Sequence, residues 1–121
     1  TGPYIQYTYV RTKSVLEKVE KLPKASEIKY EFLTDDSSIK VLKSLYAFKE
    51  TLEVTVDKNE PAILARYLIE LAQNYSNFYN NNKVLVDDKE VQNARIFLTY
   101  AVGTVLKTGA SLLGIQMPDK M

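Results

Sequence analysis

The 121-residue sequence contains no cysteine, no histidine and no tryptophan. Without cysteine, neither a disulfide framework nor a thiolate metal site is possible. Because histidine is missing too, the commonest general base is absent, and a transition-metal site would have to use carboxylates alone. Glycine and proline number only four each, so few residues interrupt regular structure. These absences argue against a disulfide scaffold, a metal centre and most kinds of active site.

Two pairs of adjacent carboxylates remain as candidates for acid–base chemistry, Asp35 with Asp36 and Asp87 with Asp88. Both pairs precede a helix that the apolar pattern predicts, and aspartate is a favoured residue at the start of a helix. We interpret them as helix caps. The glycines are scattered and form no phosphate-binding loop. We therefore expect no catalytic residue, no cofactor-binding residue and no metal ligand, so the chain is not expected to be an enzyme by itself.

The charge is balanced, with 16 lysines and arginines against 15 acidic residues and a net charge of +1. Nucleic-acid binding usually shows as a strongly basic domain, so any RNA contact must depend on a local basic face combined with aromatic side chains. No apolar run approaches the roughly 18 residues of a membrane span, and no segment has the layout of a signal peptide. We expect a cytoplasmic monomer with no membrane contact.

Apolar residues recur mainly at helical spacing, which predicts an all-α bundle of about four main helices in one domain of residues 1–121. The predicted helices are residues 3–22, residues 36 to about 53–56, residues 61–79 and residues 87–113. Pro23 is expected to end the first helix. The connection of residues 23–35 is expected to be extended and packed on the helices, because a lone strand would have no partner.

Capping and packing residues support these boundaries. The second helix is expected to be capped around Asp36, and Asp87 with Glu90 resembles a capping box for the fourth helix. Gly103 and Gly109 lie inside the fourth helix, where each costs about 1 kcal/mol relative to alanine. Close packing against another helix is the expected reason for both glycines.

Tyr79 is the first candidate for RNA contact, because it lies at the predicted end of the third helix, before a run of three asparagines and Lys83. Unpaired RNA bases are bound by aromatic stacking together with hydrogen bonds to their edges. Tyr79 with its neighbours supplies both kinds of group. The residues alone leave open the alternative of a buried tyrosine followed by a helix-ending asparagine run.

The start of the first helix holds the other candidates. Tyr4, Gln6 and Tyr7 are crowded there on more than one face, so the tyrosines suit either packing at a helix edge or base stacking. Arg11 is a candidate phosphate contact, although arginine in an apolar helix more often pairs with a carboxylate. Four lysines could track an RNA backbone or belong to a solvated face, namely Lys13, Lys18, Lys21 and Lys24.

Three stretches together resemble one known domain family. The opening is Gly2-Pro3-Tyr4-Ile5-Gln6-Tyr7 followed by Arg11, the middle runs from Glu60-Pro61 to Phe78-Tyr79-Asn80, and the end is Leu112-Leu113-Gly114-Ile115 with a Pro-Asp-Lys-Met terminus. In this order they are similar to the C-terminal anticodon-binding domain of arginyl-tRNA synthetases, which is named after its Asp-Ala-Leu-Arg (DALR) signature. The resemblance covers essentially the whole chain.

The resemblance implies an all-α bundle of the DALR type that binds the anticodon region of arginine tRNA. In the family this domain follows a class I catalytic domain, which uses ATP to join arginine to its tRNA and needs a His-Ile-Gly-His type motif. No such motif is possible in a chain without histidine. The resemblance therefore implies the C-terminal fragment of a longer ligase, with ATP bound by the catalytic domain in cis and no cofactor here.

The resemblance also implies site residues. Tyr79 matches an aromatic residue that the family places against anticodon bases, Tyr4 and Gln6 match an opening Tyr-X-Gln near the same loop, and Met121 matches a terminal methionine that approaches it. Three residues depart from the common pattern: Tyr9 stands where many members have histidine, Lys83 where some have an aromatic residue and Lys120 where arginine is usual. Arg11, Lys83 and Lys120 are the possible phosphate contacts.

Two other readings stay open on the sequence. One is the helical anticodon domain of a different synthetase, such as the cysteinyl enzyme or a glycyl β subunit. The other is a helical protein-interaction module, which the near-neutral charge allows. Affinity that falls steeply with salt would favour phosphate contacts over a protein partner.

Overall fold

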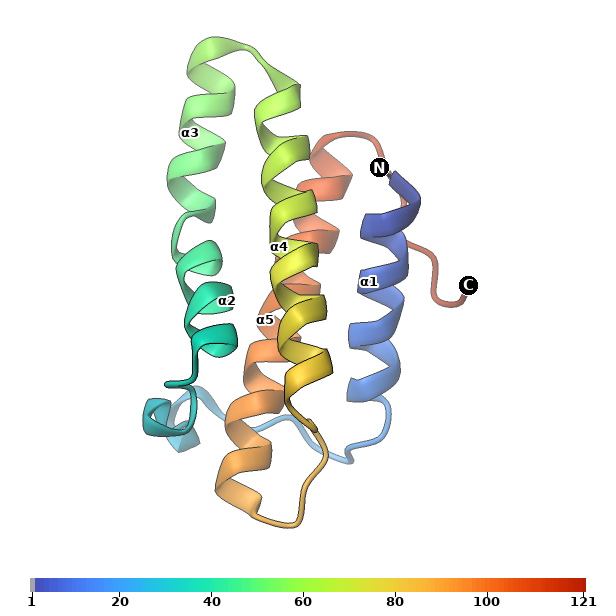
Figure 1. The fold of residues 1–121 in the computed structure, drawn as a ribbon. Coiled ribbons are helices and arrows are strands. Elements are labelled where there is room, and N and C mark those ends of the chain that lie inside the picture. The colour runs from blue at the N-terminus through green and yellow to red at the C-terminus, as the bar shows by residue number, and fades with distance from the viewer. Residues whose placement is uncertain (1) are drawn as a thin grey trace.

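The computed structural model describes residues 2–121, which form five α-helices and two short 3-10 helices. The elements are α1 (Gly2–Leu16), η1 (Ala25–Glu27), η2 (Tyr30–Phe32), α2 (Asp36–Tyr46), α3 (Phe48–Lys58), α4 (Pro61–Asn81) and α5 (Lys89–Leu112). In Figure 1, α4 lies between α1 and the α2–α3 pair, and α5 packs behind them. The expected all-α bundle is confirmed. Within residues 2–121, none of the helices combines the length and apolar content needed to cross a bilayer.

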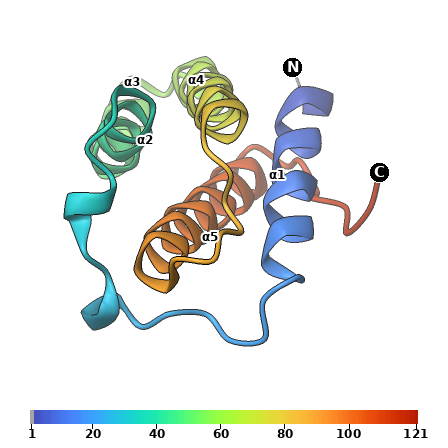
Figure 2. The same cartoon turned by 60° about the horizontal axis from the view of Figure 1, so that its bottom comes forward.

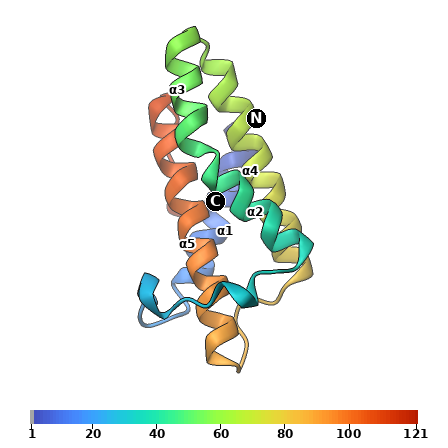
Figure 3. The ribbon, with the colours of Figure 1, turned by 90° about the vertical axis from the view of Figure 1, so that its left-hand side faces the viewer.

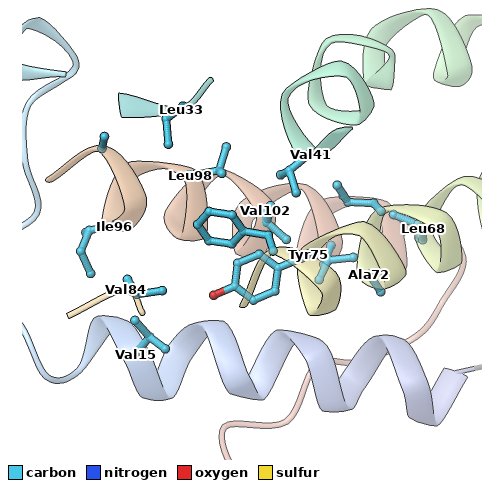
Figure 4. Packing of buried hydrophobic residues seen from close by; sticks show 14 of the residues in the cluster. Val15, Leu33, Val41, Leu68, Ala72, Tyr75, Val84, Ile96, Leu98 and Val102 are labelled. Atoms are coloured by element: carbon cyan, nitrogen blue, oxygen red, sulfur yellow. The ribbon is translucent and has the colours of Figure 1, made fainter. Parts of the chain in front are cut away.

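The core is built around the apolar stripes of α4 and α5, which face each other (Figure 4). Tyr75 lies at its centre and is fully buried. The Tyr75 hydroxyl is 3.0 Å from Thr99 Oγ1, and Thr99 already donates to the carbonyl of Arg95 at 2.9 Å. Tyr75 is therefore the donor to Thr99, which satisfies its polar end inside an apolar core. Burial raises the pKa of Tyr75 to about 12, so the phenol stays protonated.

The first helix is shorter than the sequence predicted, because it ends at Leu16 rather than at residue 22. The chain tightens there: Lys18 N–H donates to Val15 O at 3.1 Å and Val19 N–H donates to Leu16 O at 3.3 Å. A helix continued to residue 22 would carry the chain about 9 Å further along its axis, at 1.5 Å per residue. The chain instead turns, packs Val19 on the core and crosses below α5 toward α2 (Figure 2).

The predicted second helix is two helices, α2 and α3, which meet at Ala47 (Figure 3). At the junction, the Ser44 carbonyl accepts from the Tyr67 hydroxyl of α4 at 2.5 Å and from Ala47 N–H at 3.2 Å. In an unbroken helix this carbonyl would accept from the N–H of Phe48. A side chain inserted into the helical hydrogen-bond ladder is a known cause of kinks. The connection before α2 also differs, because it forms η1 and η2 instead of an extended stretch.

The helix caps lie one residue away from those predicted. Asp35, not Asp36, caps α2 and accepts from Ser38 N–H. Asp88, not Asp87, caps α5 and accepts from the N–H groups of Glu90 and the following residue, so the expected capping box is wrong. In each aspartate pair, the residue that caps the helix is the neighbour of the one predicted. The interpretation of both pairs as capping segments is confirmed.

Close helix packing at the two internal glycines is also confirmed. A Cβ atom on Gly103 would lie 2.7 Å from Thr12 Oγ1 in α1, and a Cβ on Gly109 would lie 2.7 Å from Leu68 Cδ2 in α4. These two positions let α5 approach both neighbours. Beyond α5, Gly114 has a positive φ of 77°, which ends the helix and redirects the chain.

Candidate nucleic-acid interface

Tyr79 lies near the C-terminal end of α4 and keeps 36% of its surface exposed. The guanidinium carbon of Arg11 on α1 lies 4.6 Å from the centroid of the Tyr79 ring. The ring of Tyr75 lies 6.2 Å away on the core side, at a tilt of 39°. A cation–π contact of this kind stabilises an exposed pair by about 0.5–1 kcal/mol. Tyr79 is therefore not a buried core residue, and its ring is held in place at the surface.

Two further tyrosines of α1 lie on the same face as Arg11. Tyr4, Tyr7 and Arg11 are spaced by three and four residues, which aligns them along one side of a helix. Tyr4 is 40% exposed and Tyr7 is 63% exposed. The Tyr4 hydroxyl donates to Ser76 Oγ of α4 at 3.2 Å. We call Tyr4, Tyr7, Arg11 and Tyr79 the aromatic seam, because they border the junction of α1 and α4.

A pocket of about 390 Å³ adjoins the seam at the end of α4. Its polar wall includes Lys18, Lys83 and Asn80, beside Tyr79 itself. The loop after α4 is tied down, because Arg95 of α5 donates from Nη1 to the backbone carbonyl of Lys83 at 2.6 Å. With Asn82, the pocket combines two lysines, two amides and one aromatic ring, which are the groups that bind an unpaired nucleotide and its phosphate.

The C-terminal tail runs along α1. Gln6 Nε2 donates to the backbone carbonyl of Gln116 at 2.9 Å, and Lys13 forms an ion pair with Asp119. The hydrogen bond to Asp119 raises the pKa of Lys13, and the same bond lowers the pKa of Asp119. Met117 packs against the core. These contacts fix the path of the tail.

The structure divides the predicted site residues into two groups. Gln6 lies two positions after Tyr4, which turns it about 200° around the helix axis, to the opposite flank of α1. Figure 1 shows the C-terminus on that flank, away from α4. Lys120 and Met121 follow the ion-paired Asp119 there, and Met121 is 60% exposed. The remaining predicted residues, Tyr79, Tyr4, Arg11 and Lys83, meet on the flank of α1 that faces α4.

Sequence reasoning left Tyr7 undecided and missed Ser76. The spacing of Tyr4, Tyr7 and Arg11 was visible in the sequence as a signal for one shared face. Nothing in the spacing indicates which element that face meets. The contact between Arg11 and Tyr79 joins residues that are far apart in the chain.

A family profile described as the DALR anticodon binding domain matches residues 5–121. An arginine–tRNA ligase of Halothermothrix orenii is 50% identical over 122 residues, and one of Alkaliphilus metalliredigens is 40% identical over 121. Each covers 100% of this chain. Among solved structures, the arginyl-tRNA synthetase of Thermus thermophilus matches with a TM-score of 0.89 at 28% identity, and that of Plasmodium falciparum with 0.86 at 27%. Both structural matches cover 100% of this chain.

The match is to one part of these relatives. The chain spans 21% of the length of both ligases and of both solved structures.

Proposed function

The chain belongs to the DALR anticodon-binding domain family, and we propose that it binds the anticodon loop of arginine tRNA. The observation that carries the proposal is the pairing of Arg11 with Tyr79 at the surface. The guanidinium of Arg11 lies over the ring of Tyr79, so the pair supplies a cation for a phosphate and an outward planar guanidinium on which a base can stack. Tyr4 and Tyr7 extend this surface along α1, which gives room for more than one unstacked base.

We extend the proposal to the longer protein of which this chain would be one domain. The relatives are named arginine–tRNA ligases, and this chain spans 21% of their length. We propose that residues 1–121 are a single C-terminal domain that supplies tRNA affinity and selectivity, while a catalytic domain in cis joins arginine to the tRNA with ATP. We expect the full-length protein to be a monomer in the cytoplasm. Sedimentation of the full-length protein would test whether it is monomeric.

The test is a titration of the chain with a labelled anticodon stem-loop of arginine tRNA at two salt concentrations. Tyr79→Ala is expected to weaken binding by about 1–3 kcal/mol, the contribution of one stacked base. Tyr46→Ala is a matched control, because Tyr46 is 80% exposed on α2 and lies outside the seam. We expect this control to bind like the wild type.

Competition with stem-loops of lysine, cysteine and glycine tRNAs measures selectivity. A preference for the arginine loop that is lost with Tyr79→Ala supports the proposal. Equal affinity for all loops would leave an RNA-binding bundle without selectivity, and a preference for the cysteine or glycine loop would favour a different synthetase. An affinity that changes neither with salt concentration nor with Tyr79→Ala would contradict a role for the aromatic seam.

A further inference from the structure

A second groove opens on the other flank of α4, between this helix and the α2–α3 pair. Its volume is about 690 Å³. Figure 2 shows α4 between α2–α3 on one side and α1 on the other, so the groove and the aromatic seam border the same outward face of α4. Across α4 the two lie about one helix diameter apart, roughly 10–12 Å, and Arg66 of the groove lies about 20 Å from Tyr79 along the axis, at 1.5 Å per residue.

The groove is positively charged. Lys40 and Lys43, one turn apart on α2, and Arg66 on α4 line it together with a single carboxylate, Glu70. Two other lysines of the surface are neutralised by ion pairs with carboxylates. Within residues 2–121, the structure records no such pair for the three cations of the groove. With three cations and one carboxylate, the hollow carries an excess of positive charge, which suits an anionic ligand.

The walls of the groove are fixed before any ligand arrives. Tyr67 donates its hydroxyl to the Ser44 carbonyl at 2.5 Å, and Asn74 Nδ2 donates to Ser44 Oγ at 2.8 Å. Burial raises the pKa of Tyr67, and the charge of Glu70 adds to the effect, so the phenol remains a donor. The ring of Phe48 stacks on Tyr67 at 5.8 Å. These contacts lock the end of α2 onto α4 and so present the lysines on a preformed surface.

We propose that this groove binds backbone phosphates of the same tRNA whose anticodon loop lies at the aromatic seam; the inference rests on the function proposed above. The tyrosine of the groove is used internally, so the groove offers charge rather than a stacking surface for bases. Contacts of this kind position an RNA without reading its sequence. In this proposal, the aromatic seam contacts bases of the loop. The groove contacts phosphates elsewhere in the hairpin and so orients the hairpin across α4.

The test compares two double variants of the chain with equal change in charge. Lys40→Gln/Lys43→Gln removes the lysines of the groove, and Lys49→Gln/Lys58→Gln removes two exposed lysines of α3 that do not line it. Each phosphate contact contributes about 0.7–0.9 to the slope of log affinity against log salt. For the arginine anticodon stem-loop, we expect the first variant to lower this slope by about 1.4–1.8, twice that contribution.

Two properties separate this proposal from the function on which it rests. Loss of the groove lysines is expected to weaken the arginine and lysine stem-loops by the same factor, whereas Tyr79→Ala removes the preference between them. If the groove variant has the same affinity and salt slope as the α3 control while Tyr79→Ala still weakens binding, the groove proposal is wrong and the proposed role of the aromatic seam is unaffected. If neither the groove variant nor Tyr79→Ala changes binding, both proposals fail. Circular dichroism of each variant confirms that the helices are intact.

Discussion

The ring of Tyr79 is held from two sides, by the guanidinium of Arg11 and by the ring of Tyr75. A side chain that is already ordered loses less conformational entropy when a base stacks on it, and preorganisation of this kind raises affinity. Arg11 also leaves a positive charge beside the ring, where it would attract the phosphate of a stacked nucleotide. In the proposed site, Arg11 therefore both positions the ring and supplies a phosphate contact.

A double-mutant cycle measures this coupling. Arg11→Ala and Tyr79→Ala each weaken binding to the arginine stem-loop, but the combined loss is expected to be smaller than the sum, because Arg11 can order the ring only while the ring is present. The readout is the dissociation constant of each variant in one buffer. Arg66→Ala combined with Tyr79→Ala is the control, and its losses are expected to add. Additive losses for Arg11 would mean that it does not position the ring.

Close packing against α4, rather than helix propensity, explains why glycine occupies position 109. A Cβ added there would lie 2.7 Å from Leu68 Cδ2 and 3.1 Å from Leu68 Cδ1, and Leu68 is fully buried. Overpacking costs about 1–3 kcal/mol, against a gain of about 1 kcal/mol in helix propensity. We expect Gly109→Ala to lower the free energy of unfolding in urea by about 1 kcal/mol. Gly2→Ala meets nothing within 4 Å and is expected to be neutral, so equal stability of the two variants would contradict tight packing at Gly109.

The start of α2 depends on one carboxylate with several donors. Asp35 accepts from the Ser37 hydroxyl at 2.5 Å, the Ser38 hydroxyl at 2.6 Å and the Ser38 N–H at 3.2 Å. Asn82, which follows α4, donates to Ser37 Oγ at 2.9 Å and so joins the end of α4 to this cap. Partial burial of the carboxylate raises its pKa, but the hydrogen bonds outweigh it and lower the pKa of Asp35 from 3.8 to about 2.

The depressed pKa predicts how the stability of α2 depends on pH. The folded pKa is below the unfolded one, so the contribution of Asp35 is complete above about pH 4 and is lost as pH falls from 3.8 toward 2. We expect Asp35→Ala to lower the free energy of unfolding by about 0.5–2 kcal/mol at pH 7, the usual cost of losing a cap. The difference from wild type should shrink near pH 2. A difference that stays constant in urea titrations at both pH values would contradict this cap.

The sequence predicted the helices better than their ends. Pro61 and the apolar stripe behind it predicted α4 well, because both signals are local. The break at Ala47 was not predictable, since it depends on the hydroxyl of Tyr67, 23 residues from Ser44. The candidate site follows the same rule. The spacing along α1 was visible, whereas the contact of Arg11 with Tyr79 required the packing of α1 on α4.

The shape of the whole molecule determines how one RNA could reach both groups of predicted site residues. Tyr79 contacts Arg11 on the flank of α1 that faces α4, and the C-terminus lies on the other flank (Figure 1). A loop that stacks on Tyr79 and reaches the C-terminus must cross the outward face of this helix. Tyr7 lies on that path with 63% of its surface exposed. A near-neutral molecule with a net charge of +1 can bind RNA in this way only because its cations are gathered at particular surfaces.

Removing residues 120–121 tests whether the RNA reaches the flank of α1 on which the C-terminus lies. The deletion keeps the bond between Gln6 and Gln116 and the ion pair of Lys13 with Asp119, so the tail keeps its course and the thermal midpoint should not move. Affinity for the arginine stem-loop is expected to fall, and the salt slope to decrease by about 0.7–0.9 if Lys120 contacts a phosphate. Lys120→Gln separates the charge from the terminal methionine. If the shortened chain binds like the wild type, the RNA stays on the side of α1 that faces α4, and neither Lys120 nor Met121 belongs to the site.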